Sequence, residues 1–220
     1  MRLSWTSDTI PHGYLCDTPI HLIYRVHGCG CVGELKRLVD DATQQYRLVK
    51  QLGVATPAEL QQLIAEQMEA YDALLDAQDQ SSFPLASSGY AQPVLDSWKT
   101  LRERQACRLY AVCVMGNHVH VLLAGISGAA EARIGPLVRR HKSYTDHVLR
   151  EEAGMTGTFW DTSFYDRYVR PGRFYEVLRY ILDNPVKAGL VGSWQDWRHT
   201  WVDERCVAAL GEWEAQQARV

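Results

Sequence analysis

The sequence YAVCVMGNHVHVLL, at residues 110–123, reads as two apolar, β-branched runs joined by the turn sequence MGN. This pattern predicts a β-hairpin with a tight antiparallel connection. Because side chains alternate between the two faces of a strand, His118 and His120 are expected on one face of the second strand. Two imidazoles so placed can share a metal ion.

Sequence patterns on either side of this hairpin predict an α+β fold. Residues 19–26 read as a first strand, and the aromatic sequence near Arg167 reads as a last strand. Helical periodicity predicts helices over residues 33–53, 56–77, 93–106 and 132–152, and from residue 173 onward. This order implies an antiparallel sheet with helices packed on one side, an α+β plait. The first and third strands of such a plait are usually central, which would place the two histidines in the middle of the sheet.

The sequence TPAE, at residues 56–59, is the strongest helix start in the chain. It has Thr at the cap, Pro at the first helical position and Glu three residues after the cap. The apolar residues that follow predict core or helix-pair packing, since the polar side mixes Gln, Glu and Asp. Residues 80–89 are rich in Ser and predict a loop. We therefore interpret residues 33–90 as a helical insertion between the first strand and the next core element.

The composition, with 46% hydrophobic and 22% charged residues, is that of an ordinary globular protein. No apolar run approaches the roughly 18 residues of a membrane span. The first residues lack the apolar core of a signal peptide, so we expect a cytoplasmic protein. The six cysteines include no CxxC pair, which argues against a zinc knuckle and against a disulfide framework.

The net charge of −3 is unevenly distributed along the chain. Residues 99–200 hold 15 basic and 10 acidic residues, whereas the rest of the chain holds 8 basic and 16 acidic residues. A basic central region with acidic flanks suits a core that meets phosphate and a periphery that does not.

A second informative sequence, RYILDNPVKAGL, occupies residues 179–190. Tyr180 and Asn184 are four residues apart and so share one face of the predicted closing helix. If this helix crosses the face of the sheet that carries the histidine pair, two imidazoles, an amide oxygen and a phenol converge. That combination suits phosphodiester transfer, in which the phenol forms a covalent phosphotyrosine beside a bound divalent cation. The alternative is that Tyr180 packs as a half-buried aromatic residue and Asn184 caps the helix before Pro185.

Three segments in this order, VMGNHVHVLL at residues 114–123, FW at 159–160 and YILDNPVKAGLV at 180–191, resemble the single-tyrosine HUH transposases of small insertion sequences. The chain is most similar to the REP-associated tyrosine transposases, over residues 19–26 and 93–201. The resemblance implies an HUH plait, which is a ferredoxin-like β-α-β-β-α-β sheet with a closing helix. On this interpretation residues 1–220 form a single transposase domain, with the insertion at 33–90 and a C-terminal tail at 202–220.

The resemblance also implies a function. His118 and His120 match the metal-binding pair, Tyr180 the nucleophile, and Asn184 the polar ligand one helical turn later. The implied cofactor is a magnesium or manganese ion, and the implied partner is single-stranded DNA beside a palindromic hairpin, which would be a nucleoid-associated substrate. The protein would act as a monomer or a homodimer. The family usually has Pro where this chain has Gly116, which we interpret as a harmless turn change, and a basic residue in place of Ser163.

Six basic side chains are candidates to contact the DNA phosphates; they are Arg139, Arg140, Lys142, Arg167, Arg170 and Arg173. Two other functions stay open at this stage. One is a hairpin-binding protein that no longer cuts DNA. The other is a zinc hydrolase unrelated to DNA, which would need a further ligand near His118 for which the sequence offers no recognisable helix motif. Imidazole generally prefers zinc, nickel or copper, so the residues alone leave the metal open.

Overall fold

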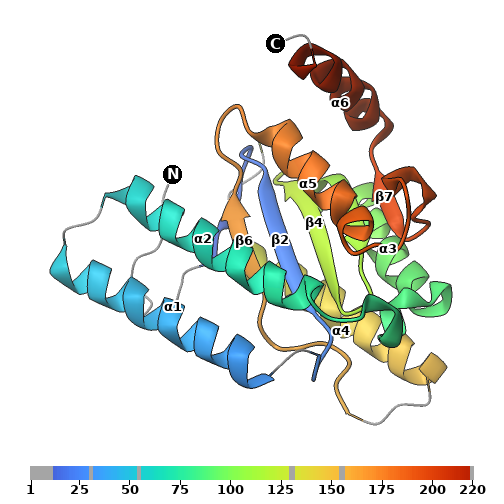
Figure 1. Cartoon of the computed structure of the whole chain (residues 1–220), viewed down its shortest axis with the longest axis horizontal. Coiled ribbons are helices and arrows are strands. Elements are labelled where there is room, and N and C mark those ends of the chain that lie inside the picture. The colour runs from blue at the N-terminus through green and yellow to red at the C-terminus, as the bar shows by residue number, and fades with distance from the viewer. Residues whose placement is uncertain (1–11, 30–31, 54–55, 129–131, 154–156, 219–220) are drawn as a thin grey trace.

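The structure is a computed structural model that describes residues 12–29, 32–53, 56–128, 132–153 and 157–218. Figure 1 shows a twisted sheet in the middle of the molecule with helices around it. In the described residues the α-helices are α1 (Val32–Leu52), α2 (Pro57–Asp76), α3 (Ser88–Glu103), α4 (Ile134–Ala153), α5 (Phe174–Lys187) and α6 (Glu204–Gln217). The strands are β1 (Tyr14–Leu15), β2 (Ile20–Arg25), β3 (Arg108–Val114), β4 (His118–Ala124), β5 (Ala132–Arg133), β6 (Tyr165–Tyr168) and β7 (Thr200–Val202). The short 3-10 helices are η1 (Gln80–Ser82), η2 (Pro84–Ala86) and η3 (Trp194–Asp196).

The main sheet has five antiparallel strands in the described part of the chain, in the order β6-β2-β4-β3-β7. Strands β3 and β4 form the predicted hairpin, and β4 is the middle strand of the five. His120 lies opposite Ile23 of β2 on one side and Cys113 of β3 on the other. The α+β fold class and the central position of the histidine strand are therefore confirmed.

The two faces of β4 pack against different helices. Val119, Val121 and Leu123 belong to a core cluster that includes residues of α3 and α4. Leu122, which shares a face with the two histidines, belongs to a second cluster with Leu178 of α5. The expectation that helices cover only one side of the sheet was wrong, because every residue of β4 is buried and helices therefore cover both of its faces.

The segment between β2 and α3 contains α1, α2, η1 and η2, and α2 crosses the sheet near β6 and β2 with α1 beside it (Figure 1). Helix α2 begins as predicted. The Thr56 side chain accepts a hydrogen bond from the Glu59 amide, and the Glu59 side chain accepts one from the Thr56 amide. Met68, Tyr71 and Leu75 bury the apolar side of α2 in the core. Asp72 of the same helix lies 3.4 Å from Nε2 of His120, so this segment carries a helix over the face of the sheet that α5 also covers.

Several boundaries differ from the sequence-based expectation. Helix α3 begins at Ser88, so Pro93 lies inside it, and the buried face that starts at Ala91 explains the earlier start. Helix α5 continues through Pro185 to Lys187. The strands β1, β5 and β7 have only two or three residues, too few for an alternating pattern to show in the sequence. No helix among the described residues has the length and apolar character needed to cross a membrane.

Candidate metal centre and tyrosine site

Strand β4 holds His118 and His120 fully buried and close to each other. Their Nε2 atoms are 2.9 Å apart. Burial lowers the pKa of each imidazole to about 3, so both rings are neutral at neutral pH. Neutral imidazole is the form that binds a metal ion.

The other ring nitrogen of each histidine has a fixed partner. His118 donates a hydrogen bond of 2.5 Å from Nδ1 to the side-chain oxygen of Asn117. His120 Nδ1 shares a hydrogen bond of 3.1 Å with Nε2 of His21, which lies on the neighbouring strand β2. Such partners fix the orientation of a metal-binding imidazole. Here they leave both Nε2 atoms directed at one point.

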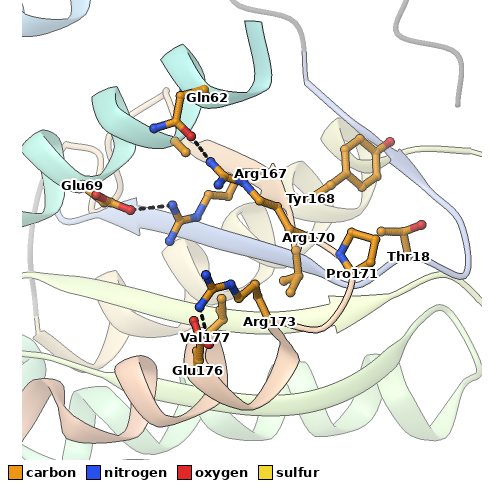
Figure 2. Close-up of a pocket in the computed structure, with 12 residues that line it drawn as sticks. Thr18, Gln62, Glu69, Arg167, Tyr168, Arg170, Pro171, Arg173, Glu176 and Val177 are labelled. Atoms are coloured by element: carbon orange, nitrogen blue, oxygen red, sulfur yellow. Dashed lines mark hydrogen bonds and ion pairs between the residues drawn. The ribbon is translucent and has the colours of Figure 1, made fainter. Parts of the chain in front are cut away.

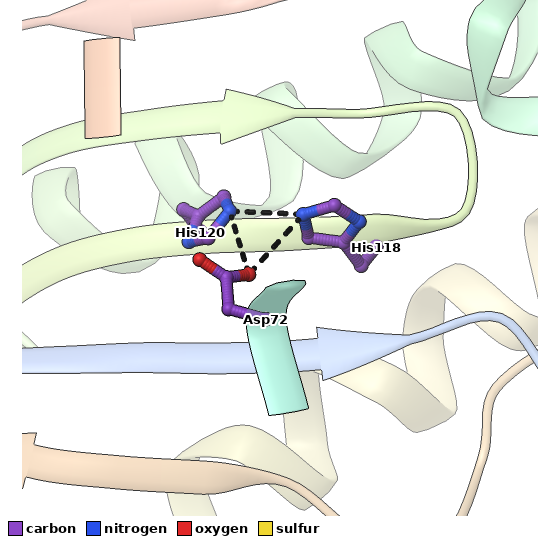
Figure 3. Close-up of side chains that lie close together, drawn as sticks. All are labelled: Asp72, His118 and His120. Carbon is purple, nitrogen blue, oxygen red and sulfur yellow. Dashed lines mark hydrogen bonds and ion pairs between the residues drawn. The ribbon is translucent and has the colours of Figure 1, made fainter. Parts of the chain in front are cut away.

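Helix α2 brings a carboxylate to the same point, as Figure 3 shows. Asp72 Oδ1 lies 3.4 Å from His120 Nε2 and 3.6 Å from His118 Nε2. Ligands that each bind a metal at about 2.0–2.2 Å lie roughly 3–3.5 Å from one another in a tetrahedral site. Asp72 is only 1% exposed, and its Oδ1 has no hydrogen-bond partner among the described residues. The three side chains therefore have the spacing and chemistry to hold a metal ion.

Helix α5 places Tyr180 beside this group within the same chain. The Tyr180 hydroxyl donates a hydrogen bond to Oδ2 of Asp72, and its ring centroid lies 6.2 Å from that of His120. Burial raises the pKa of Tyr180, and the Asp72 carboxylate raises it further. The ammonium of Lys187 lies 3.8 Å from the centre of the phenol ring. The structure thus brings together the phenol and the two imidazoles that the sequence singled out.

Asn184 is buried inside α5, one turn after Tyr180. Its side-chain Nδ2 donates a hydrogen bond of 3.0 Å to the backbone oxygen of Tyr180. Its Oδ1 is buried and, within the described part of the chain, has no hydrogen-bond partner. The alternative in which Asn184 caps the helix is wrong, because α5 runs on to Lys187. A buried amide oxygen without a partner fits a metal ligand.

Three of the six candidate arginines and lysines line a cavity of about 540 Å³ between α2 and the start of α5, shown in Figure 2. Arg167 donates to Glu69 at 2.9 Å, and Arg170 donates to Gln62, both on α2. Arg173 pairs with Glu176 of α5. All three side chains line this one cavity.

The other three candidates lie on α4, which packs against the opposite face of the sheet. Arg139 and Arg140 are exposed there. Lys142 is buried, and its ammonium donates to the backbone oxygens of Asp161 at 2.8 Å and Ser163 at 2.6 Å. Lys142 therefore holds a loop and does not present its charge on the surface. The six predicted residues do not form one continuous surface.

Sequence reasoning did not identify His21 or Asp72 as part of the site. Asp72 follows Met68 by four residues and precedes Leu75 by three, so it lies within the apolar stripe of α2. A carboxylate in that position is a signal of a functional site, since acidic side chains are rarely buried without a partner. His21 lies in a predicted core strand, where a polar residue carries the same signal.

Gly116, in the hairpin turn, is required by the packing of η1. A Cβ atom at this position would lie 1.8 Å from the backbone oxygen of Gln80. The turn change at this position is therefore tied to the packing of η1, because only glycine lets the Gln80 backbone approach so closely.

Comparisons with known proteins find a similarity to transposases. Residues 85–184 match the model of a family described as "Transposase IS200 like". A solved structure described as "Structure of the REP associates tyrosine transposase bound to a REP hairpin" matches with a TM-score of 0.50 and 12% identity, over 87% of this chain and 80% of that chain. These findings confirm the resemblance to REP-associated tyrosine transposases. A search of curated proteins gives no match.

Proposed function

We propose that this protein is a metal-dependent enzyme that nicks single-stranded DNA and transfers the cut strand, at sequences beside short palindromic hairpins. One observation carries the proposal: the Tyr180 hydroxyl lies beside the imidazole pair of β4, on the same face of the sheet and in the same chain. The transposase match over residues 85–184 supports a DNA substrate. The hairpin bound in the similar solved structure supports a substrate that contains a DNA hairpin.

The metal ion would be held by His118, His120 and Asn184, and we propose magnesium or manganese. When bound, the cation neutralises charge on the non-bridging oxygens of the scissile phosphate. The Tyr180 oxygen attacks phosphorus and loses its proton to solvent. A bond forms between that oxygen and phosphorus while the bond from phosphorus to the 3′ oxygen breaks, and the 3′ oxygen leaves and takes up a proton. The products are a 5′-phosphotyrosine and a free 3′ hydroxyl.

The covalent intermediate is what distinguishes strand transfer from hydrolysis. The phosphotyrosine conserves the energy of the phosphodiester bond, so a 3′ hydroxyl can attack it and rejoin strands. In that reverse step the bond from Tyr180 to phosphorus breaks and the tyrosine oxygen regains its proton.

We propose that the DNA backbone binds along the cavity between α2 and the start of α5. Arg167, Arg170 and Arg173 line it, and two of them now pair with carboxylates, at Glu69 and Glu176. Arginine pairs equally well with the oxygens of carboxylate and of phosphate. We propose that these three side chains contact phosphates near the cut, and that Arg139 and Arg140, on the opposite face, contact a more distant part of the DNA. Lys142, which is tied to two backbone oxygens, would act by shaping the loop.

The test is formation of a covalent adduct. The protein is incubated with Mn²⁺ and labelled single-stranded DNA taken from beside its own gene, and the mixture is separated under denaturing conditions. We expect a labelled protein band that Tyr180→Phe abolishes. Tyr175→Phe, a matched change on the same helix, should leave the band intact. An adduct that survives Tyr180→Phe would remove this residue as the nucleophile, and binding of the DNA hairpin without any adduct would favour a non-cutting binding protein.

A second candidate function is favoured by Asp72. The zinc hydrolase considered from the sequence needed a further ligand near His118, and Asp72 Oδ1 lies 3.6 Å from His118 Nε2. A zinc hydrolase would use bound water as the nucleophile and would form no protein adduct. The adduct experiment therefore separates the two functions.

A further inference from the structure

We propose that Asp72 of helix α2 is a further protein ligand for the divalent ion, in addition to His118, His120 and Asn184, and that ion binding fastens α2 to the sheet. This inference rests on the proposed function for the role of the ion. Asp72 lies outside residues 85–184, the part of the chain that matches the transposase family. The ligand would therefore come from a segment that this match does not cover.

The geometry of the donors is the first support. Two imidazole nitrogens from β4 and one carboxylate oxygen from α2 converge, with separations of 2.9, 3.4 and 3.6 Å between the donor atoms. Both imidazoles are oriented by other side chains, through His21 and Asn117. A triangle of three donors with fixed orientation is the arrangement found in metal sites.

The charge at the site is the second support. Asp72 and Asp76 are one helical turn apart, and the Oδ1 atoms of both approach His118 Nε2, each at 3.6 Å. Carboxylates at this spacing repel each other. In the described structure neither Oδ1 has a hydrogen-bond partner, although both are buried atoms. Buried carboxylates are normally paired with a cation or bind a metal, and a divalent ion among these groups would balance both charges.

The docking of α2 is the third support. Asn117 donates hydrogen bonds of 3.0 Å from its side-chain nitrogen to the backbone oxygen of Leu75 and to the side chain of Gln78. The same amide accepts the hydrogen bond from His118. One residue therefore positions both a histidine and the end of α2 that carries Asp72.

The donor set also indicates the class of metal. Two imidazoles with one carboxylate are typical of sites for first-row transition metals such as iron, cobalt, zinc and manganese, whereas magnesium prefers oxygen ligands. Tyr180 lies against the other oxygen of Asp72, so the carboxylate would connect the ion to the nucleophile.

The experiment is a titration of the whole protein with Co²⁺, followed by calorimetry and by visible absorption. Asp72→Asn keeps the size of the side chain and an oxygen for Tyr180 but removes the charge. We expect at least about a tenfold loss of Co²⁺ affinity, the loss typical of a disturbed metal site. Glu69→Gln, on the same helix but exposed and paired with Arg167, should change the affinity less than twofold. Equal affinities and spectra for wild type and Asp72→Asn would overturn the proposal.

A second variant gives a positive signature even if Asp72→Asn folds poorly. Asp72→Cys would place a thiolate at the same point, and a thiolate bound to Co²⁺ gives an intense near-ultraviolet charge-transfer band. Cys113, which is buried on β3, is present in both proteins and serves as the internal control. We expect the band only in Asp72→Cys, and its absence from a protein that binds Co²⁺ would contradict ligation from position 72.

Hydrogen exchange tests the fastening of α2. We expect Co²⁺ to slow amide exchange in residues 57–76 of the wild type and to leave Asp72→Asn unchanged. The adduct assay keeps this inference separate from the proposed function. Metal binding that depends on Asp72 in a protein that forms no adduct would refute only the function, whereas an adduct with metal binding independent of Asp72 would refute only this inference.

Discussion

Replacing Gly116 by alanine tests how closely the turn before the two histidines is packed. The new methyl group would lie 1.8 Å from the backbone oxygen of Gln80 and 2.7 Å from its carbonyl carbon. Both are backbone atoms, so no side-chain rotation relieves the clash. The Leu85 amide also donates a hydrogen bond of 3.2 Å to the Gly116 oxygen. The hairpin turn and the segment after α2 would therefore have to separate.

The size of the effect follows from the contacts that separation would weaken. Forcing a methyl group into a packed region costs about 1–3 kcal/mol, and a lost hydrogen bond adds about 1 kcal/mol. We expect Gly116→Ala to lower the free energy of unfolding by about 2–4 kcal/mol. For a protein of this size each kcal/mol lowers the melting temperature by about 2–4 °C, so the expected decrease is roughly 5–15 °C.

The measurement is thermal and urea unfolding followed by circular dichroism. Gly211→Ala, inside α6, is the matched control, since its new methyl group would meet no described atom within 4 Å beyond its chain neighbours and the backbone of its own helix. That change should stabilise the protein by about 0.5–1 kcal/mol, as alanine does in a helix interior. Gly116→Pro should be destabilising too, although proline is the residue that the family resemblance leads one to expect. A melting temperature for Gly116→Ala within 2 °C of the wild type would refute the reasoning.

Two further predictions concern other buried histidines. The change His21→Ala removes the hydrogen-bond partner of His120 and should weaken Co²⁺ binding about 10- to 100-fold. Calorimetry measures the affinity, with the exposed His27→Ala as the control. An unchanged affinity would contradict the role given to His21. Burial lowers the pKa of His141 to about 3, whereas in the unfolded chain it is about 6.5. Between these two values the unfolded chain binds more protons than the folded chain, so the stability of the fold decreases as the pH falls. From pH 7 to pH 5 this residue should account for about 2 kcal/mol of lost stability. Urea midpoints of His141→Gln should therefore fall less over that range than those of the wild type, and an equal fall would rule the effect out.

Local patterns in the sequence were enough to predict the central parts of the fold. The β-branched runs around the MGN turn give the hairpin, and the TPAE sequence gives the start of α2 through a capping box whose hydrogen bonds are all local. The pairing of Tyr180 with the histidines needed more than periodicity. It was predicted from the order of the two motifs and from the resemblance they support.

Long-range packing explains what the sequence did not reveal. Asp72 reaches the histidines only because α2 crosses the sheet, and no local pattern encodes that path. His21 meets His120 through the register of two strands that lie far apart in the chain. The need for glycine at position 116 likewise depends on Gln80, which arrives from a different element.

The position of β4 in the sheet has a consequence for how the molecule moves. This strand is hydrogen-bonded on both sides, and every residue of it is buried. Its amides should be among the slowest in the protein to exchange with solvent, because only near-complete unfolding exposes them. Local opening of β6, β7 or the outer helices would therefore leave the spacing of the two imidazoles unchanged.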